Sequence, residues 1–244
     1  MKSFYKHTIL IIGSITLFAS GCTASQQTPV PTVSATQAPA LTAAPGSSPQ
    51  AGDVSQLPPD LAYMILLEQV KRSDPDFDFT KLRWTFAQTE NYDPYNIDNS
   101  ELISSMYDAY DNNDFQLAVE LASRILEKNY LLPDPHFILL QSYQALGDQQ
   151  NAEFHNYFLR GIISSIAESG NGRSPETAFI VIQIEEEHFM LTILGLQDSD
   201  QSFVEENGVP YDIFTGIAAD TNEQTTVYFD ISIPYKWLNN SIPQ

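Results

Sequence analysis

Apolar residues in the first half of the folded sequence recur at helical spacing. Phe79, Leu82 and Phe86 stand at i, i+3 and i+7, which predicts one buried helical face. Asp78 directly precedes this run and is suited to cap the helix, and Asp60 precedes an earlier apolar run in the same way. We therefore expect two helices near the start of the folded chain.

A motif then repeats with an offset of 34 residues, since Asn113–Ala118 corresponds to Gly147–Ala152. Each copy supplies a turn and an Asp cap between two helices, and the helices before the copies are Glu101–Asn112 and His136–Leu146. This offset resembles that of the tetratricopeptide repeat, in which helical hairpins stack side by side. The alternative is an unrelated helical bundle whose two hairpins agree in spacing by chance.

The pattern changes after residue 168. The expected elements are a buried strand, a short helix closed by a glycine, a hairpin and a final strand, at Thr177–Ile184, Glu186–Leu194 with Gly195, Ser202–Phe214 and Thr225–Ile231. Asn207-Gly208 suits the positive φ angles of a tight hairpin turn. The segment is too short for parallel crossovers between all strands, so we expect a mainly antiparallel sheet.

These elements predict an α+β fold in which tetratricopeptide-like helical hairpins precede a small, mainly antiparallel sheet with a short helix. We assign 60–168 to the helical repeat-like region and 169–244 to the α+β region. Residues 174–244 carry 12 acidic residues and one basic residue, Lys236, so the second region is strongly acidic.

The first 21 residues have the layout of a signal peptide. Lys2 and Lys6 precede a short apolar stretch, Thr8–Phe18, which is well under the roughly 20 residues that a membrane-spanning helix needs. The small residues Ala19–Gly21 then lead to Cys22, and this segment resembles the bacterial lipoprotein box. The resemblance implies cleavage before Cys22 and lipid attachment to it. The alternative is an ordinary secreted protein with a chance cysteine there.

Residues 22–59 have the composition of a tether. The segment is rich in Pro, Ala, Ser, Thr and Gln, and Asp53 is its only charged residue. Such a sequence buries too little apolar surface to offset the entropy of ordering it, so we expect a disordered linker between the lipidated Cys22 and the folded part.

Composition excludes several classes of function. The chain has 244 residues, 11 Lys and Arg, 31 Asp and Glu, and a net charge of −20. Binding to nucleic acid needs a basic face that neutralises phosphates, so we expect no nucleic-acid partner. Cys22 is the only cysteine, which excludes an intrachain disulfide and an iron–sulfur cluster.

A search for catalytic and metal-binding motifs yields weak candidates. Asp74, Asp76 and Asp78 have the spacing of a calcium loop, but Phe79 and Thr85 stand where glycine and glutamate are required. No nucleophile motif, zinc motif or cofactor motif is present. We therefore predict no catalytic residue, metal ligand or cofactor-binding residue.

Two places remain as a candidate ligand or partner surface. His155 lies on the apolar face of the last helix, where a hydrogen-bonded core histidine is the alternative. Asn171, Arg173 and Ser174 belong to a glycine-rich junction that could bind an anion, and a helix cap at Gly170 followed by a turn is the alternative. The acids of Glu185–His188 equally suit a solvated first helical turn, where the helix dipole favours them.

Several blocks resemble a bacterial family called domain of unknown function 4919. They are 169–191, Val209–Asp212, Val227–Ile231, Lys81–Arg83 and Asn91–Tyr95, and the resemblance covers about 75–240. It implies an exported protein and supplies no catalytic residues.

The sequence leads to two functional hypotheses. The first is a membrane-anchored lipoprotein on the extracytoplasmic side, held by lipid on Cys22, that serves as a non-catalytic module for a ligand or an envelope protein. The alternative is an envelope hydrolase that acts on cell-wall or glycan material through paired acids of the C-terminal half. That alternative requires Glu185, Glu186, Glu187, Asp212 or Asp230 to converge.

Overall fold

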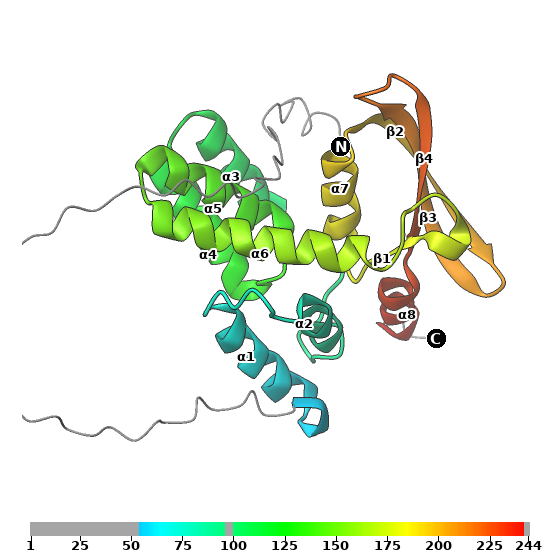
Figure 1. The fold of residues 1–244 in the computed structure, drawn as a ribbon, viewed down its shortest axis with the longest axis horizontal. Helices are drawn as coiled ribbons and strands as arrows, with labels where there is room; N and C mark the ends of the chain where they lie inside the picture. The colour runs from blue at the N-terminus through cyan, green and yellow to red at the C-terminus, as the bar shows by residue number, and fades with distance from the viewer. Residues whose placement is uncertain (1–53, 96–99, 242–244) are drawn as a thin grey trace, which may run out of the picture. The chain divides into compact units, whose positions relative to one another are not determined.

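The computed structural model describes residues 54–95 and 100–241, which belong to one compact unit (Figure 1). The predicted signal peptide, Cys22 and most of the predicted tether lie outside these residues. The described chain begins with a 3-10 turn, Val54–Gln56, whose Val54 side chain is buried in the main core. None of the described helices is long and apolar enough to cross a membrane.

Two short helices open the unit, α1 (Pro59–Val70) and α2 (Phe79–Phe86). The predicted cap of α2 is confirmed, because the Asp78 carboxylate accepts a hydrogen bond from the Lys81 backbone N–H at 2.8 Å. The predicted cap of α1 is wrong, since α1 begins at Pro59 and the Asp60 carboxylate instead accepts from the Glu90 backbone N–H. Proline at the first position needs no amide partner, so α1 starts without a side-chain cap.

Four helices follow as antiparallel neighbours: α3 (Ser100–Asp111), α4 (Phe115–Lys128), α5 (Pro133–Leu146) and α6 (Gln149–Ala167). Each of α3–α5 packs against the helix that follows it. The Asp114 and Asp148 carboxylates cap α4 and α6, and Gly147 between α5 and α6 has a φ of 79°. The two helical hairpins predicted from the repeated motif are therefore present.

The sheet contains four strands in the order β1-β4-β3-β2. They are β1 (Phe179–Ile180), β2 (Leu196–Glu206), β3 (Val209–Ala218) and β4 (Gln224–Asp230). The β2–β3 and β3–β4 pairs are antiparallel, whereas β1 pairs in parallel with β4. Asn207 and Gly208 both have positive φ between β2 and β3, as the predicted tight turn requires.

Two further helices adjoin the sheet, α7 (Ile184–Ile193) and α8 (Ser232–Ser241). The strand predicted over Thr177–Ile184 is much shorter, because the chain leaves β4 after Val181 bonds to the Asp230 carbonyl and α7 begins at Ile184. Helix α8 was absent from the sequence prediction. The α+β fold class, with a helical part before a mainly antiparallel sheet, is confirmed.

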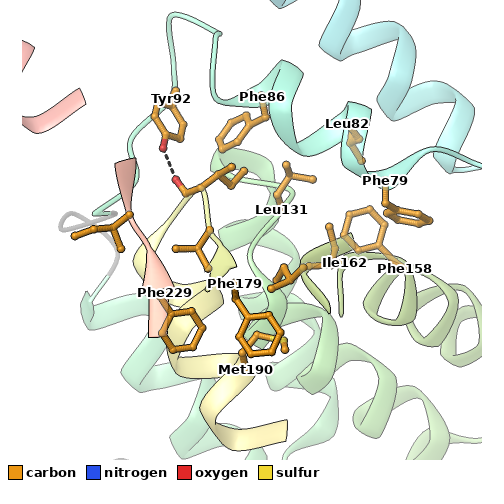
Figure 2. Packing of buried hydrophobic residues seen from close by; sticks show 14 of the residues in the cluster. Phe79, Leu82, Phe86, Tyr92, Leu131, Phe158, Ile162, Phe179, Met190 and Phe229 are labelled. Carbon is orange, nitrogen blue, oxygen red and sulfur yellow. Dashed lines mark hydrogen bonds between the residues drawn. The ribbon is translucent and has the colours of Figure 1, made fainter. Parts of the chain in front are cut away.

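The main hydrophobic core contains residues from both the helical part and the sheet. Phe79, Leu82 and Phe86 of α2 belong to the same buried cluster as Phe158 and Ile162 of α6 and Phe179 and Phe229 of the sheet (Figure 2). The Tyr92 hydroxyl donates to the Ile182 carbonyl within this cluster. Helices α1, α2 and α6 therefore share one core with the strands.

A second cluster lies among α3, α4 and α5, with Met106, Ala118, Ile125 and Ile138 fully buried. Tyr130 packs against both clusters. The chain thus contributes α1 and α2 to the main core, builds the second cluster, and returns to the main core with α6.

Candidate functional site

His155 is a core residue that pairs with His136. Their Nδ1 atoms are 2.8 Å apart, and His136 Nε2 is 2.9 Å from the Tyr130 carbonyl oxygen. The carbonyl only accepts, so His136 Nε2 carries a proton and its Nδ1 accepts from His155 Nδ1–H. Phe158 stacks on the His136 ring, and Tyr143 stacks on the His155 ring. His155 therefore has the surroundings of a hydrogen-bonded core histidine.

Both histidines are held neutral. Burial and the neighbouring His155 lower the pKa of His136 from 6.5 to about 3, against the opposing effect of its bond to Tyr130. Burial alone lowers the pKa of His155 to about 4. A proton on either ring would put a charge in an apolar environment.

The glycine-rich junction is an internally bonded turn. The backbone N–H groups of Asn171 and Gly172 both donate to the Thr177 carbonyl, and the Asn171 side chain accepts from the Arg173 N–H and the Thr177 hydroxyl. The Ser174 hydroxyl lies 3.2 Å from that of Thr177. Two backbone amides that an anion would need are thus already used, and only the exposed Arg173 side chain extends from the turn.

Gly170 does not cap α6, contrary to one interpretation of this segment. The C-cap is Glu168, and Gly170 is needed for a different reason. A Cβ atom on Gly170 would lie 2.4 Å from the Thr177 and Ala178 carbonyl oxygens. The junction and His155 contact different residues. Gly172 packs on Phe179, and the Gly172 carbonyl accepts a hydrogen bond from the Tyr228 N–H.

A buried ion pair links the helical part to α7. Arg83 Nε and Nη2 donate to the two carboxylate oxygens of Glu186 at 2.9 and 2.7 Å. The guanidinium also donates to the Ser165 hydroxyl and the Ile180 carbonyl, while Glu186 accepts from the Ile182 N–H. Every charged oxygen is therefore bonded, which is the condition under which a buried pair is tolerated.

The sequence held a signal for this pair that the prediction did not use. Arg83 lies between Leu82 and Phe86 on the apolar face of α2. A charged residue on an apolar face indicates a buried partner, but the pattern does not say which acid supplies it.

Two carboxyl groups meet beneath the sheet, those of Glu187 from α7 and Asp212 from β3. Glu187 is 0% exposed and Asp212 is 6% exposed. Among the described residues no N–H or hydroxyl group donates to either Glu187 oxygen, and the Asp212 carboxyl group lies close enough to raise the pKa of Glu187. Two buried acids so placed are stable together only when one of them carries a proton.

The proton belongs to Glu187. Burial, the charge and hydrogen bond of Asp212, and then Glu185 and Glu186 raise the pKa of Glu187 well above its usual value. Burial also raises the pKa of Asp212, but the Gln201 amide, 2.9 Å away, and the bond from Glu187 favour its ionised form. The arrangement is a protonated acid that donates to a carboxylate.

One aromatic residue, Tyr95, lies near this carboxyl pair. Burial and the charges of Asp212 and Glu187 raise the pKa of Tyr95, so its phenol lies within electrostatic reach of both acids. The Tyr95 ring is 6.0 Å from that of Trp237 in α8, and the neighbouring Tyr235 ring is 5.5 Å from that of Phe203 in β2. Segments quoted for the family resemblance, 91–95, 169–191 and 209–212, supply Tyr95 and the two acids.

The sequence signal for Asp212 was its position two residues before Phe214 in β3. Residues i and i+2 of a strand share a face, so Asp212 lies with Phe214 on the core face of the sheet. The acid triplet 185–187 was noticed, but its helical phase, which buries Glu186 and Glu187, required the start of α7.

A cavity of about 540 Å³ lies between α2 and α6. Its lining combines aromatic rings, hydroxyl groups, one amide, three acids and one cation: Phe77, Phe79, Tyr157, Thr80, Ser164, Ser165, Asn156, Asp78, Glu153, Glu168 and Arg160, with Pro75 and Gly161. The helices approach closely there, because a Cβ on Gly161 would lie 2.1 Å from the Phe79 ring.

The described residues contain no group of three or more His, Cys, Asp or Glu side chains placed to hold a metal ion. Asp74 and Asp76, which have calcium-loop spacing, instead form a turn in which the Asp74 carboxylate accepts from the Asp76 N–H.

The comparisons with known proteins give one match. The family model described as domain of unknown function (DUF4919) matches residues 53–240. Neither the curated proteins nor the solved structures give a match.

Proposed function

The chain belongs to the DUF4919 family, whose description assigns no activity. We propose that it is an exported lipoprotein that binds a ligand or protein partner at the cell envelope. Lipid on Cys22 holds it on the extracytoplasmic side of a membrane. The helical hairpins, which resemble tetratricopeptide repeats in their 34-residue offset, supply α6, which forms one wall of the proposed binding cavity.

The α2–α6 cavity is the observation that carries the proposal. A binding site needs solvent-open space with polar groups that fix orientation and apolar groups that are desolvated. The cavity offers both, because Asn156, Arg160 and Ser164 are exposed polar residues above the rings of Phe79 and Tyr157. The chain's buried ionisable groups, by contrast, bond mainly to one another.

Photo-crosslinking in living cells tests this proposal. A photoreactive residue in place of Asn156 should capture a discrete partner, whereas one in place of Gln116, exposed on α4, should not. Ser164→Trp would fill the cavity from an exposed position, and Gln150→Trp places the same side chain elsewhere on α6. We expect S164W to abolish the crosslink and Q150W to keep it. Equal crosslinking by all variants would refute a role for the cavity.

The lipid anchor needs a separate test. Cells fed an alkyne-labelled fatty acid should label the wild-type chain, and Cys22→Ala should remove both the label and the association with membranes. Retention of label in C22A would show that lipid is attached elsewhere or that none is attached through Cys22.

One observation favours the hydrolase alternative, the carboxyl pair of Glu187 and Asp212. A protonated acid beside a carboxylate is the arrangement that acid–base hydrolysis uses. The mutual effect of the two acids on their pKa values is also typical of a proton-sharing dyad.

Incubation of the purified chain with cell-wall glycan and with unfolded protein, followed by mass spectrometry, tests this alternative. Hydrolysis that is lost in both Glu187→Gln and Asp212→Asn would support it. Hydrolysis that survives both substitutions, or none from a correctly folded chain, would exclude these acids as catalytic groups.

A further inference from the structure

Strand β2 is an edge strand with a free side. It is the last strand in the order β1-β4-β3-β2, and among the described residues it pairs only with β3. At 11 residues it is also the longest strand of the sheet. An edge strand presents a row of backbone N–H and C=O groups that another extended chain can pair with.

Apolar side chains lie in the middle of this edge. Phe203 is 50% exposed and Val204 is 40% exposed, on opposite faces of the strand. All residues of β2 after Leu196 are exposed. Proteins usually protect such an edge by shortening it, covering it, charging it or inserting a bulge. Here the acids and a bulge between Gln197 and Asp200 serve that purpose, and the bulge leaves 200–206 in regular pairing with β3.

The charges on β2 indicate what can pair with it. Asp198 and Asp200 lie toward one end, Glu205 and Glu206 lie at the other, and the strand has no basic residue. A second copy is disfavoured, because each β2 would bring four acids and no basic residue to the pair, and like charges on neighbouring strands repel. An extended segment with Lys or Arg on both sides of an apolar centre satisfies the backbone, the apolar pair and the acids together.

We infer that β2 is a docking edge for a basic, extended segment of another protein, which adds to the sheet as a fifth strand beside it. Backbone pairing along β2 supplies the affinity, as in other cases of strand addition. Phe203 and Val204 contact apolar side chains of the added strand, and Asp200 and Glu205 select for its positive charges. This edge and the α2–α6 cavity share no residue, so one can fail while the other stands.

Titration of the full-length chain in detergent with synthetic peptides tests the inference. The probe is a peptide of the length of β2 with lysines at both ends and valine and threonine between them. We expect it to bind, and its affinity to fall as salt is added. A peptide with glutamate in place of each lysine should not bind, nor should the lysine peptide with a central proline, because proline cannot join a strand ladder.

A charge swap supplies the matched control. Asp200→Lys with Glu205→Lys should weaken the lysine peptide about tenfold and create binding of the glutamate peptide. Asp220→Lys with Glu223→Lys changes the net charge equally on the exposed turn between β3 and β4, so it should leave both affinities nearly unchanged. If the two double variants weakened binding of the lysine peptide equally, the effect would come from the net charge of the protein alone, and the inference would be overturned.

Hydrogen exchange locates the contact. Binding of the lysine peptide should slow the exchange of amides within 196–206. Three results would overturn the pairing of a basic strand along β2. They are protection from exchange confined to other elements, binding of the proline peptide, and a wild-type dimer that dissociates in the D200K/E205K variant.

Discussion

The Nδ1 atoms of His136 and His155 lie 2.8 Å apart in the contact between α5 and α6. With His136 Nε2 donating to the Tyr130 carbonyl, the bond between the rings requires His136 to be neutral. Protonation of His136 would remove the acceptor and set two N–H donors against each other, and protonation of His155 would place a charge in an apolar environment. The pair therefore makes the fold sensitive to acid.

The free energy of unfolding should decrease as the pH is lowered, because of this histidine pair. Folding lowers both histidine pKa values, to about 3 and about 4, so the unfolded chain binds protons more readily. The stabilisation is complete above pH 6.5 and is lost as the pH falls toward 4, by about 2 kcal/mol per histidine at pH 4.5. Urea unfolding at several pH values measures this loss.

His155→Phe provides the comparison. It keeps a ring beside Tyr143 but leaves His136 Nδ1 unpaired, so it should cost about 1–2 kcal/mol at pH 7. Its loss of stability between pH 7 and 4.5 should be smaller than that of the wild type. The same pH dependence in both proteins would assign the acid sensitivity to other groups.

Loss of either partner in the Arg83–Glu186 pair should destabilise strongly. Arg83→Met leaves the Glu186 carboxylate buried without its cation, at an expected cost of about 3–5 kcal/mol in urea unfolding. The double variant Arg83→Met with Glu186→Met should be more stable than R83M alone, because no uncompensated charge remains. Lys71→Ala removes an exposed ion pair with Glu68 and should change little. If the loss of stability in the double variant equalled the sum of the losses in Arg83→Met and Glu186→Met alone, this interpretation would be wrong.

Glu187→Gln should stabilise the fold at neutral pH. The pKa of Glu187 is raised on folding, so the folded chain holds a proton that the unfolded chain releases above pH 4.5. Stability from this group is present at low pH and is lost as the pH rises. Glutamine keeps a donor to Asp212 without that loss, so its advantage should be larger at pH 8 than at pH 5. Exposed Glu205→Gln is the control, and an advantage that grows toward low pH would contradict the assignment.

Two glycines with positive φ should differ in their tolerance of alanine. Gly208 has a φ of 80° and no atom within 4 Å of a Cβ, so Gly208→Ala should cost about 1–2 kcal/mol from the left-handed backbone alone. Gly172 has a φ of 68°, and its Cβ would lie 2.5 Å from the Phe179 ring. Gly172→Ala should cost a further 1–3 kcal/mol or so through overpacking. Thermal unfolding of the two variants measures the difference, and equal losses would show that Phe179 moves aside freely.

Local chemistry explains which elements could be predicted from the sequence. Asp78, Asp114 and Asp148 cap helices through their own neighbours, and Asn207-Gly208 sets its own turn, so each signal is contained in a few residues. Helix α8 had local signals that the prediction did not use, since the Asp230 carboxylate accepts from the Ser232 N–H and proline is tolerated in a first helical turn, where Pro234 lies. The predicted strand over Thr177–Ile184 was shortened by its distant partner, because β4 ends at Asp230 and offers no further pairing to the chain before α7 begins at Ile184.

The candidate sites depended on distant contacts throughout. Glu187 and Asp212 were both noted as acids, but their pairing depends on the phase of α7 and the register of β3. The α2–α6 cavity depends on Phe79 meeting Gly161, which lies 82 residues later in the chain, and no local pattern encodes that contact. His155 was correctly weighed against a core histidine, yet its partner His136 was seen only as a helix residue.

The main core also bears on when the chain can fold. Arg83 and Glu186 are 103 residues apart in sequence, and α1 and α2 share their buried cluster with α6 and the sheet. Closing loops of this length costs entropy before any contact compensates for it, which slows folding. An emerging chain cannot complete this core until Phe229 of β4 has been made. The main core therefore stays incomplete through nearly all of the chain's synthesis, which suits the proposed export of an incompletely folded chain through a membrane.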